Sequence, residues 1–264
     1  MSTWAGTDLG RRIVGYDERD AILYALAVGA RATDLDLVFE ERLRVLPTFA
    51  LTLAQWAPDE LGRLGAFDVA TAVHGAQLLR ASAPLPRAGK LELTARVGEV
   101  WDKGAAAVFE VVVEGEHFEA TWSIFASGRG GFGGERGPAT TPPPDGDPAY
   151  SLLVQTAPDQ AALYRLLGDR HHMHLDPAAA LAAGQPRPFL HGLCTLAAAT
   201  LPLAQTAGAH PAELSHLEGR FSAPVFPGDR LDVRAWSAAS GFAFDVAGPD
   251  GPAITAGTAR FDLR

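Results

Sequence analysis

The stretch Leu193-Cys-Thr-Leu-Ala-Ala-Ala-Thr-Leu-Pro-Leu-Ala204 is apolar on nearly every side of the helix that it would form. A helix with this pattern belongs in the interior of a protein, where other elements cover it all round. Strand-like segments follow at residues 231–236, 242–246 and 254–261, where β-branched and aromatic residues alternate loosely with others. The pattern predicts an antiparallel sheet wrapped around one buried helix.

The first part of the chain repeats this arrangement. An Ala- and Leu-rich segment of helical character again precedes three strand-like segments, at residues 91–100, 107–114 and 118–125. The motif Ser82-Ala-Pro-Leu85 recurs as Ser222-Ala-Pro-Val225, and the segments that follow the two motifs keep the same offset. Self-similarity at half the chain length indicates a duplication. We therefore expect an α+β protein with two antiparallel sheets, each wrapped on a central helix.

A Pro- and Gly-rich stretch separates the two parts. It runs from Gly133-Gly-Glu-Arg-Gly-Pro138 into Thr141-Pro-Pro-Pro-Asp-Gly-Asp-Pro148, a composition that continues neither a helix nor a central strand. We place a linker at residues 136–150, between an N-terminal domain at 1–135 and a C-terminal domain at 151–264.

Composition excludes several classes of protein. The 264 residues are 47% hydrophobic and 20% charged, and the net charge is -9, without a polybasic stripe of the kind that nucleic-acid binding needs. A transmembrane span takes ~18 or more consecutive apolar residues, and the apolar stretches here break sooner. The single cysteine forms no intramolecular disulfide, and the first residues do not resemble a secretory signal. We expect a cytoplasmic protein that binds neither nucleic acid nor membrane.

Histidines point to the candidate chemistry, because four of the eight lie between residues 169 and 191. Asp169 and His174 could converge from an irregular turn and hold one water molecule between a proton acceptor and a proton donor, as hydration of a double bond requires. A solvated His-rich loop is the alternative that this pattern leaves open. The same histidines with Asp169 and Asp176 could in principle bind zinc or nickel. Because there is no H-E-x-x-H helix and no cysteine partner, we expect no metal.

Three further motifs bear on the chemistry. Gly192 lies where the buried helix begins, so unpaired backbone N–H groups there could stabilise an oxyanion. Cys194 is interpreted as a small core residue of that helix and not as a nucleophile. The string Gly128-Arg-Gly-Gly-Phe-Gly133 resembles a dinucleotide-binding loop, but a proline run follows it in place of a helix. No cofactor is therefore predicted.

The stretch Tyr164-Arg-Leu-Leu-Gly-Asp-Arg-His-His-Met-His-Leu-Asp-Pro177, followed by Leu190-His-Gly-Leu-Cys-Thr195, resembles the signature of the (R)-specific enoyl-CoA hydratases. These are the MaoC-like, hydratase 2 members of the hotdog superfamily. Other stretches resemble the two-hotdog form of the family: residues 20–30, 45–49, 73–77, 102–104, 128–134 and 220–228. The resemblance implies a double hotdog with the chemistry in its second half and room for an acyl chain in its first.

The resemblance also implies roles for individual residues. Asp169 and His174 match the catalytic pair that holds the attacking water, and Gly192 matches the glycine whose N–H polarises the thioester carbonyl. Four further positions match residues that contact the acyl-CoA in the family: His74, Gly75, Lys103 and Phe221. We also expect Arg170 and His172 to contact the substrate.

Two positions depart from the family pattern Asp-x-Asn-Pro-x-His. His171 replaces the asparagine that helps to position the catalytic water, and His172 replaces the proline that stiffens the turn. We expect His171 to join the catalytic group as a neutral ring hydrogen-bonded to that water, while His172 faces away.

These observations predict reversible hydration of trans-2-enoyl-CoA to (R)-3-hydroxyacyl-CoA, or the reverse dehydration. One alternative is a dehydratase acting on a carrier-protein-bound or unusual thioester in a biosynthetic pathway. A second alternative is a non-catalytic hotdog protein that binds acyl thioesters. The expected partners are an acyl-CoA or acyl-carrier-protein thioester and, in a homodimer, a second copy of the chain.

Overall fold

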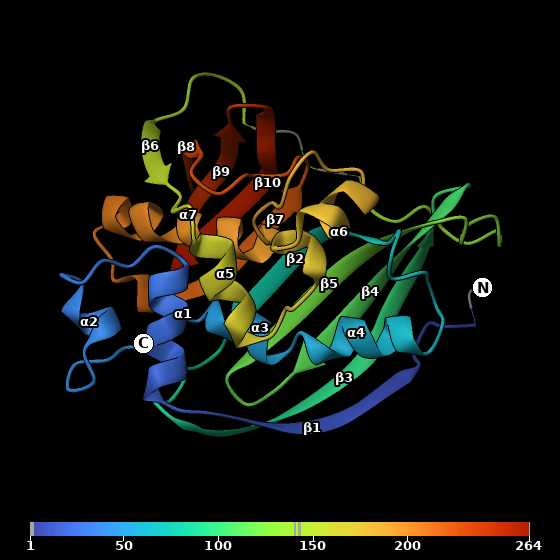
Figure 1. Cartoon of the computed structure of the whole chain (residues 1–264), viewed down its shortest axis with the longest axis horizontal. Helices are drawn as coiled ribbons and strands as arrows, with labels where there is room; N and C mark the ends of the chain where they lie inside the picture. The colour runs from blue at the N-terminus through green and yellow to red at the C-terminus, as the bar shows by residue number, and fades with distance from the viewer. Residues whose placement is uncertain (1–2, 140, 142–143, 264) are drawn as a thin grey trace.

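The computed structural model describes residues 3–139, 141 and 144–263. Part of the predicted linker, residues 140, 142 and 143, lies outside the described residues. In the part that is described, ten strands form one antiparallel sheet (Figure 1) in the order β1-β3-β4-β5-β2-β7-β10-β9-β8-β6. The strands of the first half are β1 (Asp8–Tyr16), β2 (Val73–Ala81), β3 (Gly89–Asp102), β4 (Ala106–Glu114) and β5 (Phe118–Ser127). Those of the second half are β6 (Tyr150–Gln155), β7 (Leu214–Phe221), β8 (Arg230–Ala238), β9 (Gly241–Gly248) and β10 (Gly251–Phe261).

The two halves have the same strand order, and they meet edge to edge. β2 pairs with β7 in an antiparallel register in which Leu78 lies opposite Glu218. The two predicted sheets are thus joined into one, because each half would otherwise expose a row of unpaired backbone groups at this edge. The α+β, double-hotdog fold class is confirmed.

The helices lie on one side of the sheet (Figure 1) and fall between the first and second strand of each half. The first half has α1 (Glu18–Ala27), α2 (Leu35–Val38), α3 (Phe49–Leu53) and α4 (Trp56–Arg63). The second half has α5 (Gln160–Tyr164), α6 (Pro177–Ala182) and α7 (Gly192–Ala207), with short 3-10 turns η1 (Arg165–Leu167), η2 (His172–His174) and η3 (Pro211–Glu213).

The long helix predicted from the apolar stretch is α7. It packs against β6, β7, β9 and β10, and its residues from Leu193 to Thr200 are all buried. The first half has no single helix of this length, because α3 and α4 are separated by Ala54 and Gln55. Pro58 lies in the first turn of α4, where its missing N–H needs no helical partner. The central helix is therefore continuous in the second half and divided in the first.

The Gly-rich loop after β5 is tied to the end of β3. The Asp102 carboxylate accepts hydrogen bonds from the backbone N–H groups of Gly131 (2.9 Å), Gly104 (2.8 Å) and Gly133 (2.8 Å). These bonds lower the pKa of Asp102 to about 2. Gly131 and Gly133, in the string that resembles a dinucleotide-binding loop, thus bind a carboxylate of the protein itself.

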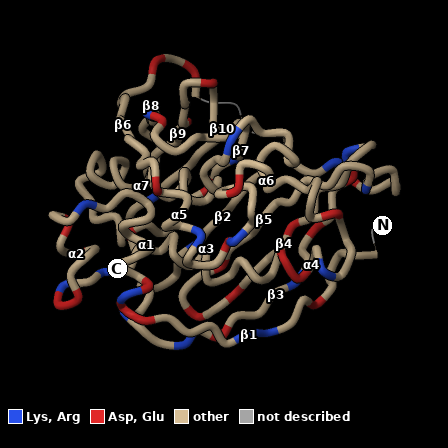
Figure 2. The backbone as a smooth tube through the Cα atoms, viewed as in Figure 1, with Lys and Arg blue, Asp and Glu red and all other residues tan. Residues whose placement is uncertain are grey.

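No part of the described backbone concentrates charged residues of one sign (Figure 2). Lys and Arg residues lie scattered among Asp and Glu along the backbone (Figure 2). Among the described residues, no helix is both long and apolar enough to cross a membrane.

Candidate active site

Both halves of the protein line a cavity of about 650 Å³. The second half contributes the loop around Asp169 and the start of α7. The first half contributes Phe67, residues 69–74 and part of α4. Most of the first-half wall is apolar, including Val69, Ala72 and Val73. A polar cluster therefore opens into a cavity large enough for a small organic ligand.

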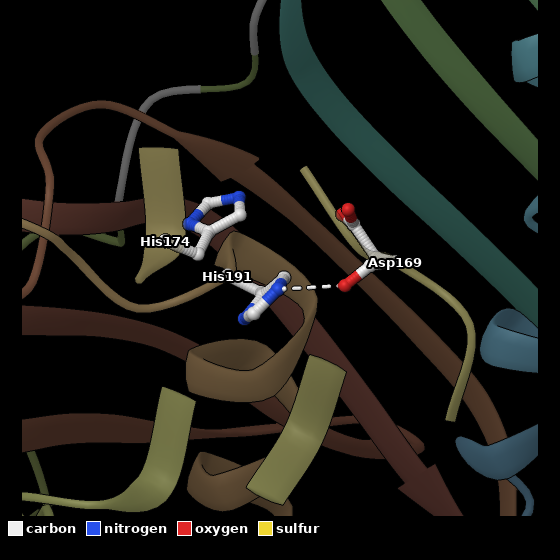
Figure 3. A group of neighbouring side chains, drawn as sticks. All are labelled: Asp169, His174 and His191. Carbon is white, nitrogen blue, oxygen red and sulfur yellow. Dashed lines mark hydrogen bonds between the residues drawn. The ribbon is translucent and has the colours of Figure 1, made fainter. Parts of the chain in front are cut away.

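Asp169, His174 and His191 form the centre of the polar cluster (Figure 3). Nδ1 of His174 lies 2.9 Å from the Phe189 carbonyl oxygen, and Nε2 of His191 lies 3.2 Å from the Asp169 carbonyl oxygen. Because a carbonyl oxygen only accepts, each of these nitrogens carries the proton, and Nε2 of His174 keeps its lone pair. His174 is thereby prepared to accept a proton.

The surroundings of Asp169, His174 and His191 determine the charge of each side chain. Burial lowers the pKa of His174, and burial lowers the pKa of His191 to about 3, so both rings are neutral at pH 7. Burial alone would raise the pKa of Asp169, but the hydrogen bond with His171 opposes that rise, and the pKa lies below its ordinary value. The cluster therefore holds an ionised carboxylate beside a neutral imidazole.

His171 contacts Asp169 directly. Its Nδ1 lies 2.6 Å from Oδ1 of Asp169, and its backbone N–H donates to the same oxygen at 3.1 Å. The hydrogen bond with Asp169 raises the pKa of His171. The ionised carboxylate favours the imidazolium form more than water would. The neutral ring hydrogen-bonded to the catalytic water stays a prediction. His172, by contrast, is exposed and does not line the cavity.

Gly192 allows the Phe221 ring to approach the start of α7. A Cβ at this position would lie 2.8 Å from Cδ1 of Phe221, so only glycine fits without a shift. The Phe221 ring in turn meets the His74 ring edge-on, with ring centroids 4.7 Å apart. Residues from α7, β7 and β2 thus form one wall of the cavity, with the first N–H groups of α7 beside it.

The loop that carries Asp169 passes close to the first half. A Cβ on Gly168 would lie 3.0 Å from the carbonyl oxygen of Thr52 in α3. At its far end the loop is fixed by Asp176, whose side chain accepts from the Ala178 backbone N–H and caps α6. The glycine and the helix cap hold Asp169 and His174 in place between them.

The cluster is suited to water better than to a metal ion. Asp169, His174 and His191 each offer one possible ligand atom, and these atoms lie within 4.8 Å of one another. However, the two imidazole rings stack with centroids 3.8 Å apart and planes 29° apart, so their in-plane lone pairs do not converge on one point. Asp176, considered as a ligand in the sequence, caps α6 instead.

The structure brings together six of the predicted site residues and leaves four outside the cavity wall. Asp169, His171, His174, Gly192, His74 and Phe221 line the cavity. Gly75 lies at an irregularity in the pairing of β2 with β5, and Arg170 is exposed. Lys103 donates from Nζ to the Arg136 carbonyl oxygen. Contacts of substrate with Gly75, Lys103, Arg170 and His172 stay predictions.

Sequence reasoning left two residues of the site out of the predicted set. His191 is buried and stacks on His174, and its position directly before Gly192 was the available signal. Asp59 lines the cavity from α4 of the first half. Nothing in the local sequence of α4 distinguishes Asp59 from an ordinary surface carboxylate.

Comparison with known proteins places the chain in a family. Residues 15–128 match the MFE-2 hydratase 2 N-terminal domain, and residues 139–245 match the MaoC like domain. The 3-hydroxyacyl-thioester dehydratase Y of Mycobacterium tuberculosis is 38% identical over 256 residues, which cover 89% of this chain and 88% of that protein. Enoyl-CoA hydratase ChsH3 of the same organism is 34% identical, with 82% of each chain covered. The peroxisomal multifunctional enzyme type 2 of Drosophila melanogaster is 36% identical, but this chain spans only 41% of it.

Solved structures agree with this placement. A MaoC-like dehydratase from Phytophthora capsici superposes with a TM-score of 0.87 at 26% identity, covering 98% of this chain and 96% of that one. A Mycobacterium tuberculosis protein described as having a double hotdog fold matches with a TM-score of 0.55 at 15% identity, which bears on the fold alone.

Fold and site together define a double-hotdog enzyme with an Asp–His pair in the wall of a largely apolar cavity. The chain belongs to the family of MaoC-like hydratases and dehydratases that carry a hydratase 2 N-terminal domain, and it is a hydro-lyase.

Proposed function

We propose that the protein catalyses the reversible hydration of trans-2-enoyl-CoA to (R)-3-hydroxyacyl-CoA through Asp169 and His174. The observation that supports this assignment is the pairing of an ionised carboxylate with a neutral imidazole at the wall of one cavity. Such a pair can hold a water molecule by two hydrogen bonds and take up one of its protons.

Hydration of the enoyl thioester requires the Asp169–His174 pair and a group that stabilises the oxyanion. Water attacks C3 of the enoyl thioester while one of its protons passes to the Asp169–His174 pair, and negative charge gathers on the thioester oxygen. The backbone N–H groups at Gly192, where α7 begins, stabilise that charge. The proton then passes from the pair to C2, so that the elements of one water molecule have been added across the double bond.

The first half accommodates the acyl chain in this proposal. Its contribution to the cavity includes Phe67, Val69 and Val73, which offer apolar surface beyond the catalytic pair. Burial of each methylene of an acyl chain against such surface contributes about 0.8 kcal/mol, which favours long or bulky chains.

Turnover of enoyl-CoA esters tests the proposal. Crotonyl-CoA and longer trans-2-enoyl-CoA esters are incubated with the protein, and the loss of conjugated-thioester absorbance is followed. We expect turnover that rises with chain length and yields the (R)-3-hydroxy product. A protein that binds acyl-CoA but turns over none of these esters would be the non-catalytic binding protein.

Three finer points belong to the same proposal. We expect the thioester carrier to be CoA, and a comparison of CoA and acyl-carrier-protein esters decides between the two. A homodimer is expected, and its mass in solution tests this. A cytoplasmic location is expected and is tested by microscopy of a tagged protein, because several relatives are named as peroxisomal enzymes.

A further inference from the structure

His191 contacts both members of the catalytic pair. Its Nε2 donates to the backbone carbonyl oxygen of Asp169 at 3.2 Å (Figure 3), and its ring stacks on the His174 ring with centroids 3.8 Å apart. The side chain is buried and directly precedes Gly192, where α7 begins. One side chain thus connects the backbone of the catalytic carboxylate, the ring of the base and the start of the long helix.

The His191 ring belongs to a series of four rings in contact. Besides stacking on His174, it packs against the buried Tyr164 ring, with centroids 4.8 Å apart. The His174 ring in turn meets the Phe189 ring edge-on at 4.8 Å. The series runs from α5 in the core to the wall of the cavity, which His174 and Phe189 both line. Because packed interiors hold few voids, His191 cannot move without disturbing the ring of the base.

The hydrogen bonds of His191 exclude a role as proton acceptor in the reaction. Nε2 carries the proton that it donates to Asp169, so the free lone pair lies on Nδ1. Within the described part of the chain, Nδ1 of His191 has no hydrogen-bond partner, and the atom is shielded from water. His191 therefore acts on the chemistry only through the groups that it contacts.

A neutral His191 suits the neighbour of a base. A second proton would have to lie on the shielded Nδ1, and burial lowers the pKa of His191 to about 3. A neutral ring does not repel the charge that His174 gains when it takes up a proton. A charged ring at a centroid distance of 3.8 Å would repel that charge.

We propose that His191 is a positioning residue of the active site, which fixes the Asp169 backbone and the His174 ring relative to each other. The hydrogen bond holds the loop that carries the carboxylate, and the stacking holds the plane of the base. A displacement of about 1 Å can cost about 100-fold in rate, so the loss of either contact should slow the reaction. The effect on turnover rests on the proposed hydratase function, but the placement of the His174 ring does not.

Two substitutions separate the two contacts. His191→Phe keeps a ring that can stack on His174 and removes the donor to Asp169, while His191→Gln keeps an N–H donor and removes the ring. We expect each variant to lower kcat by about 10-fold or more and to change the Kd of a non-hydrolysable acyl-CoA analogue by less than about threefold, because the reacting groups are displaced and the acyl chain keeps its contacts.

His216→Phe is the matched control. The His216 imidazole on β7 is hydrogen-bonded to the Thr258 hydroxyl at 3.0 Å and does not line the cavity. This variant also replaces a partly buried, hydrogen-bonded imidazole by a phenyl ring, and it should keep kcat within about twofold of wild type.

Titration of His174 by NMR supplies a readout that a merely structural role would not change. Burial lowers the pKa of His174, so removal of the ring that covers it should raise that pKa toward its ordinary value of 6.5 in His191→Gln. In His191→Phe the cover remains, and the pKa should stay in place. Asp169 and His171, whose charges also act on His174, are present in both variants. The signal is assigned by its loss in His174→Gln, and the acid limb of kcat/KM should follow the same shift.

Three results would overturn the proposal. Values of kcat within about twofold of wild type in both variants would show that neither contact positions the pair. A loss of analogue binding as large as the loss of kcat would make His191 a substrate contact. Equal His174 titrations in the two variants would show that the ring does not cover the base. His191→Asn replaces His191→Gln if the latter does not fold. Absence of turnover in the wild-type protein contradicts the hydratase function, while the NMR titration still decides the placement of His174.

Discussion

At the scale of single residues, the neighbours of Asp169 and His174 determine which of the two can accept a proton. His174 donates a hydrogen bond from Nδ1–H to the Phe189 carbonyl oxygen, and burial lowers the pKa of the ring. Asp169 stays ionised because His171 bonds to it. The division of charge between two adjacent groups is what acid–base catalysis of hydration needs.

Replacement of Asp169 by asparagine should lower kcat by about 100-fold or more, because a positioned acid–base group contributes at least that much. Kinetics on a trans-2-enoyl-CoA ester measure the loss, with circular dichroism to show an intact fold. The matched control is Asp176→Asn, since Asp176 caps α6 and does not line the cavity. Similar losses in both variants would assign the effect to the loop and not to the catalytic carboxylate.

The acid limb of the pH profile should report His174. Because burial lowers its pKa below the ordinary value of 6.5, the ring stays a base into mildly acidic solution. As pH falls through the lowered pKa, the ring is protonated and kcat/KM declines. We therefore expect the midpoint of the acid limb below pH 6.5, and a midpoint above that value would contradict the neutral buried base.

At the scale of elements, the start of α7 combines a helix terminus with close packing. Gly192 sits under the Phe221 ring, and the N–H groups of the first turn have no partner inside the helix. The rest of the helix is buried against the sheet, so its terminus cannot easily shift relative to the cavity.

Gly192→Ala should impair catalysis through steric overlap. The added Cβ would lie 2.8 Å from Phe221, so the ring or the helix start must move, at a cost of about 1–3 kcal/mol in the free energy of unfolding. We expect kcat/KM to fall at least 10-fold, a size typical of a lost oxyanion contact. Phe221→Leu in the same background should restore part of the stability, and failure to do so would place the overlap elsewhere.

Cys194→Ala should leave kcat within about twofold of wild type. The thiol is buried in α7, donates to the Ala27 carbonyl at 3.4 Å, and burial raises its pKa to about 12. The thiolate that a nucleophile requires is therefore absent at neutral pH. Kinetics and thermal unfolding check this, with a stability loss of about 1 kcal/mol expected from the small cavity. A large loss of kcat in a stable variant would contradict a packing role.

At the scale of the whole molecule, the two halves share one strand order but contribute different parts of the site. Each half has the same strand order, and β2 and β7 join the halves into one sheet. The continuous helix, the Asp–His pair and the N–H groups of Gly192 all belong to the second half, while the divided helix of the first half helps to line the cavity.

One ligand per chain follows from this division. Titration with a non-hydrolysable acyl-CoA analogue should give one equivalent per chain, because both halves together line the cavity that Asp169 and His174 face. Isothermal calorimetry measures the stoichiometry, and Asp169→Asn should bind with the same stoichiometry. Two equivalents of equal affinity would show that the first half has kept a site of its own.

Local patterns in the sequence predicted much of the strand layout and the buried helix. Segments 91–100, 107–114 and 118–125 lie in β3, β4 and β5, where alternation of side chains reflects one buried face. β1 and β6 were not predicted. Both lie at the edges of the sheet, and neither shows the clear alternation of buried and exposed residues seen in β5. β2 and β7 were also missed, and only their pairing with each other shows that the two sheets are one.

The sequence by itself determined that Asp169, His174 and Gly192 lie near one another, because they are close in the chain and their order is specific. The tertiary structure alone decided which groups share the cavity. Asp59 reaches the site because α4 folds against the first half of the sheet while the Asp169 loop passes over α3. Asp59 and Asp169 are more than 100 residues apart in the chain, so only the packing of the two halves against each other brings both carboxylates to one cavity.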